Sequence, residues 1–578
     1  MLRAHMDRRK FLQISTLAVG GAAAAWPQAG AAREKPQVCP KSAPPAKTLV
    51  VFRPGEISTR AWDVSLTVSC LQGIVNRVAP RLYLIHDRYD ELWLEWLRER
   101  GDVQDIRPVG IAELFEQFLP AVKQMYVTDP AVPASINAAT MLAAVRGGLV
   151  VTPELSDQFD LPLGIAPDSS QMGLDLRTLG WKKDIDAYRW VYNEIGSALS
   201  RKALAILDPK ETALRDYLIE FRIPILWIAG RDDTETNPAA SPAEEKEFAR
   251  EIMMKWPPNI PCFGWPSSGY KQGGIGETPG VQLMSQCAKF SVCTAYDGYS
   301  PTVGNLSVHS GTTAILKQST RDAVPQPGKV YYAFIRSDGD GWNFQRHYYR
   351  KLFDDPRHGT VPIGWQVGPT AMDGQPDILD YYYKKARPGD YFVNALSGVG
   401  YIHEDDYAAN YPPEQQEEIW RGYIELSEHY LAGIDTRILA TYSEMKPERR
   451  KMFAGMFGVR GILGNYARSH QTNLSNLVEE VEGVPWFRAA NSSPESFTFT
   501  PWAQQSAVSF MVDEIRRWTP KSRPAFLYIF LANWLTDMGM AESIARELGG
   551  DYLAVRADEL ASLYTQYRAK SVAAGGSL

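Results

Sequence analysis

Cysteine is scarce in this sequence, with five residues among 578, and none of the five forms a CxxC pair. A zinc-ribbon site therefore has no support. An oxidising compartment would permit a disulfide among Cys262, Cys287 and Cys293. The odd total leaves at least one thiol unpaired within the chain. We expect no catalytic cysteine, no metal site and no cofactor.

Long basic runs are also absent, and the formal net charge is −6. Proteins that bind nucleic acid without sequence preference usually present clustered positive charge to the phosphates. A negative chain without such clusters is a poor candidate for that class. Aromatic residues are plentiful, with 16 tryptophans and 28 tyrosines. They suit stacking on sugars, but each one is equally suited to an ordinary core.

No apolar stretch of membrane-spanning length follows the first thirty residues. Those residues carry paired arginines, Arg8-Arg9, followed by the short Ala- and Gly-rich run Ile14 to Trp26 and a small-residue cleavage site at 29–31. This pattern is typical of a twin-arginine signal peptide over residues 1–31. We therefore expect the twin-arginine export machinery as a partner and a periplasmic or secreted product with no membrane association after signal removal.

The sequence shows no internal repeat at a fixed period, so the chain divides by composition instead. Residues 32–47 are rich in proline and alanine and indicate a linker. Strand and helix patterns alternate over residues 48–325, which predicts an N-terminal α/β region of small subdomains. Its expected bounds are 48–124, 125–200 and 201–325, and a C-terminal domain is expected over 326–578.

The C-terminal domain contains eight short apolar runs with helical patterns between most of them. Eight β/α units in about 250 residues match the size and rhythm of a (β/α)8 TIM-like barrel. A doubly wound open sheet would show the same alternation and remains the alternative. The runs cover residues 330–336, 361–367, 391–397, 436–442, 459–465, 484–490, 524–530 and 551–557.

Polar and aromatic residues follow these runs, at the strand ends where barrel enzymes place their chemistry. The carboxylates Asp338, Asp340 and Glu404 are the predicted catalytic residues. Asp338 would act as nucleophile or base, Glu404 as acid, and Asp340 would orient substrate or tune a pKa, because glycoside hydrolysis uses two carboxyl groups across the scissile bond. The predicted substrate-binding residues are Trp342, Gln366, Gly398, Gly400, Tyr401, His403, Glu444, Tyr466, Trp534 and Arg556.

Purely structural roles are alternative interpretations of the same residues. Asp338 or Asp340 could cap the helix that starts near Gly341, since aspartate is a favoured N-cap residue. Gly398 and Gly400 could form an ordinary turn, and Tyr401 could simply pack in a core. His403 has no partner at HxxxH spacing. The acidic run after it could be a solvated loop.

Three separated elements resemble one family. Ser397-Gly398-Val399-Gly400-Tyr401 is similar to the motif that names the GxGYxYP family of bacterial proteins, although His403-Glu404 replaces the Tyr-Pro of that motif. The run 337–340, SDGD, is similar to its acidic element after the first strand of the C-terminal domain. The run 71–77, LQGIVNR, followed by the run 80–84, PRLYL, is similar to its N-terminal region.

The resemblance spans roughly residues 48–560 and implies a carbohydrate-active protein, because the family is grouped with barrel-type glycoside hydrolases and deacetylases. Cleavage of glycosidic bonds in an oligo- or polysaccharide is the leading expectation. Two alternatives stay open. One is metal-dependent deacetylation of a polysaccharide, with one aspartate of SDGD holding the metal and the other acting as base. The other is a non-catalytic glycan-binding protein.

Overall fold

A computed structural model describes residues 36–57, 60–158, 173–268, 273–321, 323–464, 476–492 and 501–573. The predicted signal peptide at 1–31 and the predicted binding residue Tyr466 lie outside these ranges. Among the described residues, no helix combines the length and the apolarity that crossing a membrane requires. All five cysteines are described, and each is a buried free thiol, so the disulfide that the sequence permits is not formed.

The first sheet is parallel, with strand order β2-β1-β3, and is built entirely within residues 48–108. Asp87 starts the helix that follows β2, because its carboxylate accepts the backbone N–H groups of Tyr89 and Asp90. The elements are β1 (Thr48–Phe52), α2 (Ala61–Asn76), β2 (Leu82–Leu84), α3 (Arg88–Glu99), β3 (Asp105–Pro108) and α4 (Ile111–Phe118).

The second sheet, of order β5-β4-β6, is also parallel. Gly147 ends its longest helix with φ of 79°, a left-handed conformation that glycine adopts without a Cβ clash. The elements are β4 (Gln124–Val127), α5 (Ala134–Arg146), β5 (Gly148–Val151), α6 (Pro153–Gln158), β6 (Leu174–Asp175) and α7 (Asp184–Ile195).

The third sheet has four parallel strands in the order β10-β9-β7-β8. Its strand β10 is buried along its whole length, as expected for a parallel strand covered on both faces. The elements are β7 (Leu204–Ile206), α8 (Arg215–Glu220), β8 (Ile225–Leu226), α9 (Arg231–Thr236), α10 (Pro242–Lys255), β9 (Ile260–Gly264), α11 (Glu277–Gln286), β10 (Lys289–Cys293) and α12 (Leu306–His309).

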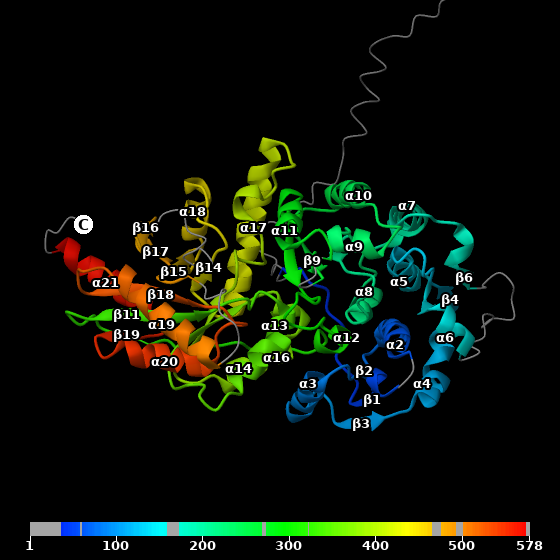
Figure 1. Cartoon of the computed structure of the whole chain (residues 1–578), viewed down its shortest axis with the longest axis horizontal. Coiled ribbons are helices and arrows are strands. Elements are labelled where there is room, and N and C mark those ends of the chain that lie inside the picture. Colours follow the sequence, from blue (N-terminus) through cyan, green and yellow to red (C-terminus); the bar gives the residue numbers. More distant parts are fainter. Residues whose placement is uncertain are drawn as a thin grey trace, which may run out of the picture. The chain divides into compact units, whose positions relative to one another are not determined.

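The C-terminal region carries a nine-stranded sheet, and each of the eight predicted apolar runs supplies one of its strands (Figure 1). The strands are β11 (Val330–Arg336), β12 (Ile363–Val367), β13 (Asp390–Asn394), β14 (Ile438–Ala440), β15 (Gly461–Gly464), β16 (Val478–Val481), β17 (Val484–Arg488), β18 (Ala525–Leu531) and β19 (Tyr552–Ala554). The helices are α13 (Trp342–Arg346), α14 (Tyr348–Phe353), α15 (Ala371–Gly374), α16 (Pro376–Lys385), α17 (Pro413–Gly433), α18 (Pro447–Ala454), α19 (Pro501–Trp518), α20 (Met538–Leu548) and α21 (Ala557–Ala573).

The described strands do not form the closed eight-stranded barrel that the sequence predicts. Strand β18 pairs with β11 along its whole length, so β12 and β19 share the other edge of β11. Strand β16, absent from the prediction, is antiparallel and pairs with β17 at the end of the sheet. Strands β17 and β18 meet through one isolated bridge, Ala489 to Tyr528. The architecture is therefore mixed α/β with parallel sheets.

Candidate active site

The loop after β11 carries the sequence SDGD and turns sharply against the neighbouring strand. A Cβ atom on Gly339 would lie 1.5 Å from the carbonyl oxygen of Gln366, so only glycine fits there. The Gly339 carbonyl accepts the N–H of Gly368 at 2.6 Å. Asp338, the residue before Gly339, has φ of 59°, a conformation uncommon outside glycine. Asp338 and Asp340 flank this close contact in the sequence.

Asp338 interacts with residues of the C-terminal region. Its carboxylate accepts a hydrogen bond from the Ser337 hydroxyl, and its charge raises the pKa values of Tyr349 and Tyr528 further above their usual range. Asp340 also interacts electrostatically with carboxylates of the third domain. Burial raises its pKa to about 7, and the charges of Glu277 and Asp297 contribute to the rise. The sequence predicts both aspartates as catalytic, and the structure joins Asp340 to two further carboxylates.

Asp297 follows β10 of the third sheet and is held by three hydrogen-bond donors. One carboxylate oxygen accepts the backbone N–H groups of Tyr299 at 2.8 Å and Ser300 at 2.9 Å. The other oxygen accepts Nδ2 of Asn343, a fully buried side chain on α13, at 2.9 Å. Burial raises the pKa of Asp297 to about 6 even though these donors favour the charged form. Asn343 thus connects the Asp340 loop to the turn that carries Asp297.

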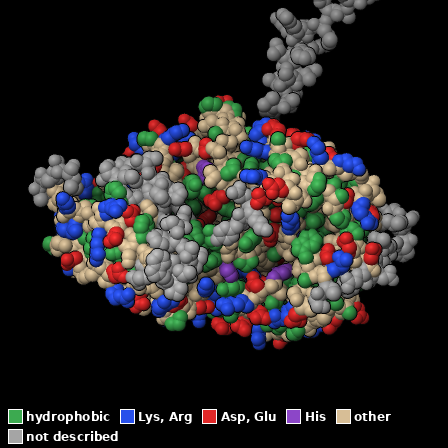
Figure 2. All heavy atoms as spheres, in the orientation of Figure 1, with side chains coloured by type: hydrophobic (Ala, Val, Ile, Leu, Met, Phe, Trp, Pro, Cys, Tyr) green, Lys and Arg blue, Asp and Glu red, His purple; other side chains and the backbone are tan. Residues whose placement is uncertain are grey.

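Glu277 is the first residue of α11, and its carboxylate accepts the Tyr401 hydroxyl at 3.2 Å. The surrounding protein raises the pKa of Glu277, although its side chain remains accessible to solvent. Figure 2 shows acidic side chains set back in the middle of the face that it presents.

The glycine motif SGVGY joins the C-terminal region to the third sheet. Gly398 has φ of 99° and packs on Ser427, and a Cβ on Gly400 would lie 2.4 Å from the ring of Phe290. These close contacts let the backbone of Tyr401 pair with Ser291 of β10, with N–O distances of 2.8 and 3.1 Å. The glycines predicted as substrate contacts therefore contact protein, and they place the Tyr401 hydroxyl on Glu277.

Glu404 lies in a different environment from Asp340, because its side chain is buried and its carboxylate is satisfied by protein donors. It accepts the Ser397 hydroxyl at 2.6 Å, the backbone N–H of Tyr442 at 2.8 Å and the Ser443 hydroxyl at 2.8 Å. Burial raises its pKa. The carboxylate ties the loop after β13 to the loop after β14. His403 beside it stacks on the Tyr442 ring at 4.9 Å, and burial lowers its pKa.

The remaining predicted binding residues differ in their burial and in their contacts. Trp342 and Gln366 are buried, and their Nε1 and Oε1 atoms have no hydrogen-bond partner among the described residues. Glu444 forms an ion pair with the buried Arg488 at 3.0 Å. Arg556 is buried and binds Asp558 and Ser319, with its guanidinium over the Tyr391 ring. Trp534 is half-buried and stacks on Tyr299 at 5.0 Å.

Sequence reasoning missed Glu277 and Asp297 because residues 256–325 look irregular in composition. The signal that could have found Asp297 is its place after the buried run 289–293, at a strand end like those searched in the C-terminal domain. Among the described residues, no group of three or more His, Cys, Asp or Glu side chains has a geometry that could hold a metal ion.

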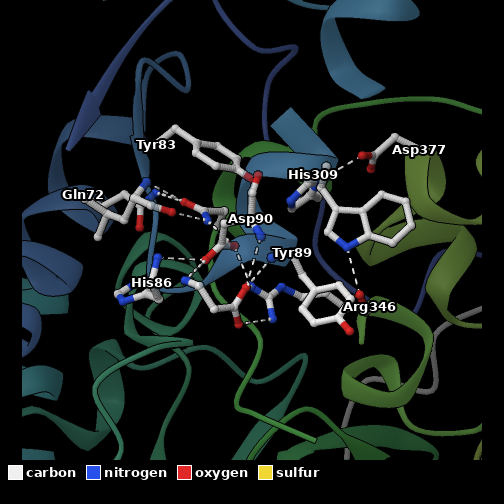
Figure 3. Close-up of polar contacts among 12 residues, drawn as sticks. Gln72, Tyr83, His86, Tyr89, Asp90, His309, Arg346 and Asp377 are labelled. Carbon is white, nitrogen blue, oxygen red and sulfur yellow. Dashed lines mark hydrogen bonds and ion pairs between the residues drawn. The ribbon is translucent and has the colours of Figure 1, made fainter. Parts of the chain in front are cut away.

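A buried polar network anchors α13, the helix that begins two residues after Asp340 (Figure 3). Arg346 of this helix pairs with Asp90 of α3 at 2.6 Å and with Asp87 at 3.1 Å. Asp90 also accepts Nδ2 of Asn305 at 3.0 Å. The LQGIVNR segment joins the same network, since Gln72 of α2 donates to Oδ1 of Asn305 at 2.7 Å. The first sheet, α12 and the helix that follows the Asp340 loop are thereby held together.

Comparison with known families gives four matches along the chain. A model described as "GxGYxYP putative glycoside hydrolase C-terminal domain" matches residues 328–565. The first, second and third domains of the same family match residues 57–119, 123–199 and 201–311. A search of curated proteins found no match.

One solved structure shares the fold. It is a crystal structure described as a "putative hydrolase" from Bacteroides thetaiotaomicron VPI-5482, with a TM-score of 0.72 and 18% sequence identity. The alignment covers 92% of this chain and 97% of that one. At this identity the likeness concerns the fold alone.

Proposed function

Because this chain belongs to the GxGYxYP family, we propose that it hydrolyses glycosidic bonds with Asp340 and the two carboxylates beside it. One observation carries the proposal: the charges of Glu277 and Asp297, from the third domain, act on Asp340 of the C-terminal domain, and Asn343 of the helix after Asp340 donates to the Asp297 carboxylate. Hydrolysis of a glycoside needs one carboxyl group that is protonated and one that is ionised. Close carboxylates produce that asymmetry, since each charge disfavours ionisation of the next.

Asp340 is the proposed acid. With a pKa of about 7, a large fraction of Asp340 is protonated at neutral pH and can pass the proton to the glycosidic oxygen as the bond breaks. Asp297 is the proposed base or nucleophile, because three N–H donors stabilise its ionised form. It would take the proton of the attacking water or form the glycosyl ester that water then opens. Glu277 would keep the pKa of Asp340 raised.

The two pKa values set an expected pH profile. Asp297 must lose its proton, so kcat/KM should fall below about pH 6, and Asp340 must keep its proton, so kcat/KM should fall above about pH 7. Activity should therefore peak between these values. Rates measured from pH 4 to 9, beside the unfolding midpoint at each pH, check this expectation. A profile flat through pH 6 to 8 in a folded protein would contradict the assignment.

Glu404→Gln separates the acid predicted from sequence from the acid proposed here. If Glu404 only ties two loops together, the variant should lose about tenfold in kcat or less, keep the alkaline limb of its pH profile, and unfold more easily, since a buried carboxylate acceptor is replaced by an amide. A loss of a hundredfold or more, together with loss of the alkaline limb, would return the acid role to Glu404. The matched control is Glu444→Gln, which removes the charge of an ion-paired carboxylate.

A further inference from the structure

An aromatic pair borders the carboxylates on the side of Asp297. Tyr299 lies two residues after Asp297 and is fixed there by its backbone N–H, which donates to the carboxylate. Its ring stacks on Trp534, which follows β18, with centroids 5.0 Å apart and planes 25° apart. Phe344 of α13 meets the Trp534 ring edge-on at 6.4 Å. The pair is therefore assembled from two sheets, as the carboxylate group is.

These two aromatic residues retain access to solvent, unlike Tyr401 and Trp342. Tyr299 and Trp534 are half-buried, and the adjacent Tyr296 is 36% exposed. By contrast, Tyr401 is 2% exposed and Trp342 is fully buried, so they serve packing and hydrogen bonding. Ligand sites are commonly lined by aromatic surface beside a few placed polar groups. An accessible stacked pair next to Asp297 has the composition of a ring-binding subsite.

The negative charge near Tyr299 and Trp534 restricts the charge of a ligand that could bind there. Asp297, Asp340 and Glu277 all carry carboxylates, and in the described part of the chain no lysine or arginine forms an ion pair with any of them. Their other partners are backbone N–H groups, the Asn343 amide and the Tyr401 hydroxyl. A ligand with its own carboxylate or sulfate would add like charge without a compensating cation. Neutral sugars avoid this repulsion.

We propose that Tyr299 and Trp534 form a subsite that stacks a neutral sugar ring beside Asp297, so that the substrate is an uncharged glycan of at least two units. One ring would occupy the aromatic pair, and the next bond would lie against Asp297 and Asp340. The inference rests on the proposed function for the place of the cleaved bond. The stacking site itself does not require turnover and is measured by binding.

Calorimetric titration of the full chain carrying Asp340→Asn measures binding without turnover. The probes are neutral pentasaccharides of glucose, xylose, mannose and N-acetylglucosamine, and the pentasaccharide of galacturonic acid. At least one neutral probe should bind, and the acidic probe should bind at least tenfold more weakly. Adding Tyr299→Ala should weaken the neutral probe by about tenfold, the loss expected for one aromatic stacking contact.

Two further variants control this experiment. Tyr299→Phe keeps the ring and should bind as the parent does. Phe457→Ala removes a ring that is 89% exposed and distant in sequence from the pair, and it should also leave binding unchanged. Equal affinity with and without the Tyr299 ring, tighter binding of the acidic probe, or binding of no neutral probe would overturn the subsite. Normal turnover by Asp340→Asn would instead overturn the proposed catalytic role and leave the binding result standing.

Discussion

Replacing Asp340 by asparagine is expected to lower kcat by about 10²- to 10⁴-fold, the usual contribution of a general acid or base. Asparagine has nearly the same shape but holds no transferable proton, so KM should change little. Turnover of a neutral glycan by wild type and variant at pH 6.5 measures the effect. Asp338→Asn is the matched control, because it alters the neighbouring aspartate, to which the proposal assigns no catalytic role. An equal loss in the control would contradict the separation of the two roles.

The same substitution is expected to stabilise the fold at alkaline pH. The pKa of Asp340 rises from 3.8 to about 7 on folding, so the unfolded chain releases its proton at lower pH than the folded chain. The free energy of unfolding therefore falls as pH rises through that window, and above it the buried charge destabilises the fold. Asparagine carries no charge, so Tm should rise at pH 8 and stay unchanged below pH 4. A variant less stable than wild type at pH 8 would contradict the raised pKa of Asp340.

Replacing Arg346 by methionine is expected to destabilise the protein by about 3–5 kcal/mol, because it leaves the fully buried Asp90 without its cation. Methionine fills much of the volume, so loss of charge dominates the effect. Urea unfolding followed by circular dichroism, with calorimetry to resolve separate transitions, measures it. Activity should fall with stability, since α13 follows the Asp340 loop directly.

Arg250→Met is the control for that measurement. Arg250 pairs with Glu247 on an exposed surface of α10, where solvent screening leaves an ion pair with little effect on stability. The double variant Arg346→Met with Asp90→Asn should recover part of the lost stability, because the unpaired charge is removed. A loss in Arg346→Met no larger than in Arg250→Met would show that the network contributes little.

Local patterns predicted much of the C-terminal sheet, because buried parallel strands are near-continuous apolar runs that a sequence displays directly. Whether the strands close into a barrel was not predictable in the same way, because closure depends on which edge of β11 the last strand pairs with. Strand β19 pairs with Val330–Tyr332, on the edge of β11 where β12 pairs with Phe334–Arg336. Strand β16, with two glutamates in four residues, lacks the apolar run on which the prediction relied.

Only part of the candidate site could be predicted from the sequence. Asp340 follows a buried strand, and the expectation that functional residues lie just after strand ends identified it. Glu277 and Asp297 belong to another sheet, and their approach to Asp340 depends on the packing of two domains, which no local pattern records. Glu404 was predicted to be catalytic because it lies beside the glycine motif. Its three donors, Ser397, Tyr442 and Ser443, come from two separate loops, so its burial could not be read from neighbouring residues.

The pairing of Tyr401 with Ser291 makes the C-terminal domain dependent on its neighbour. A fragment beginning at residue 328 would contain Asp340 but neither Glu277 nor Asp297, and the ring face of Phe290 that receives Gly400 would be missing. Such a fragment would leave the backbone N–H and carbonyl of Tyr401 without the Ser291 partner that they have in the full chain.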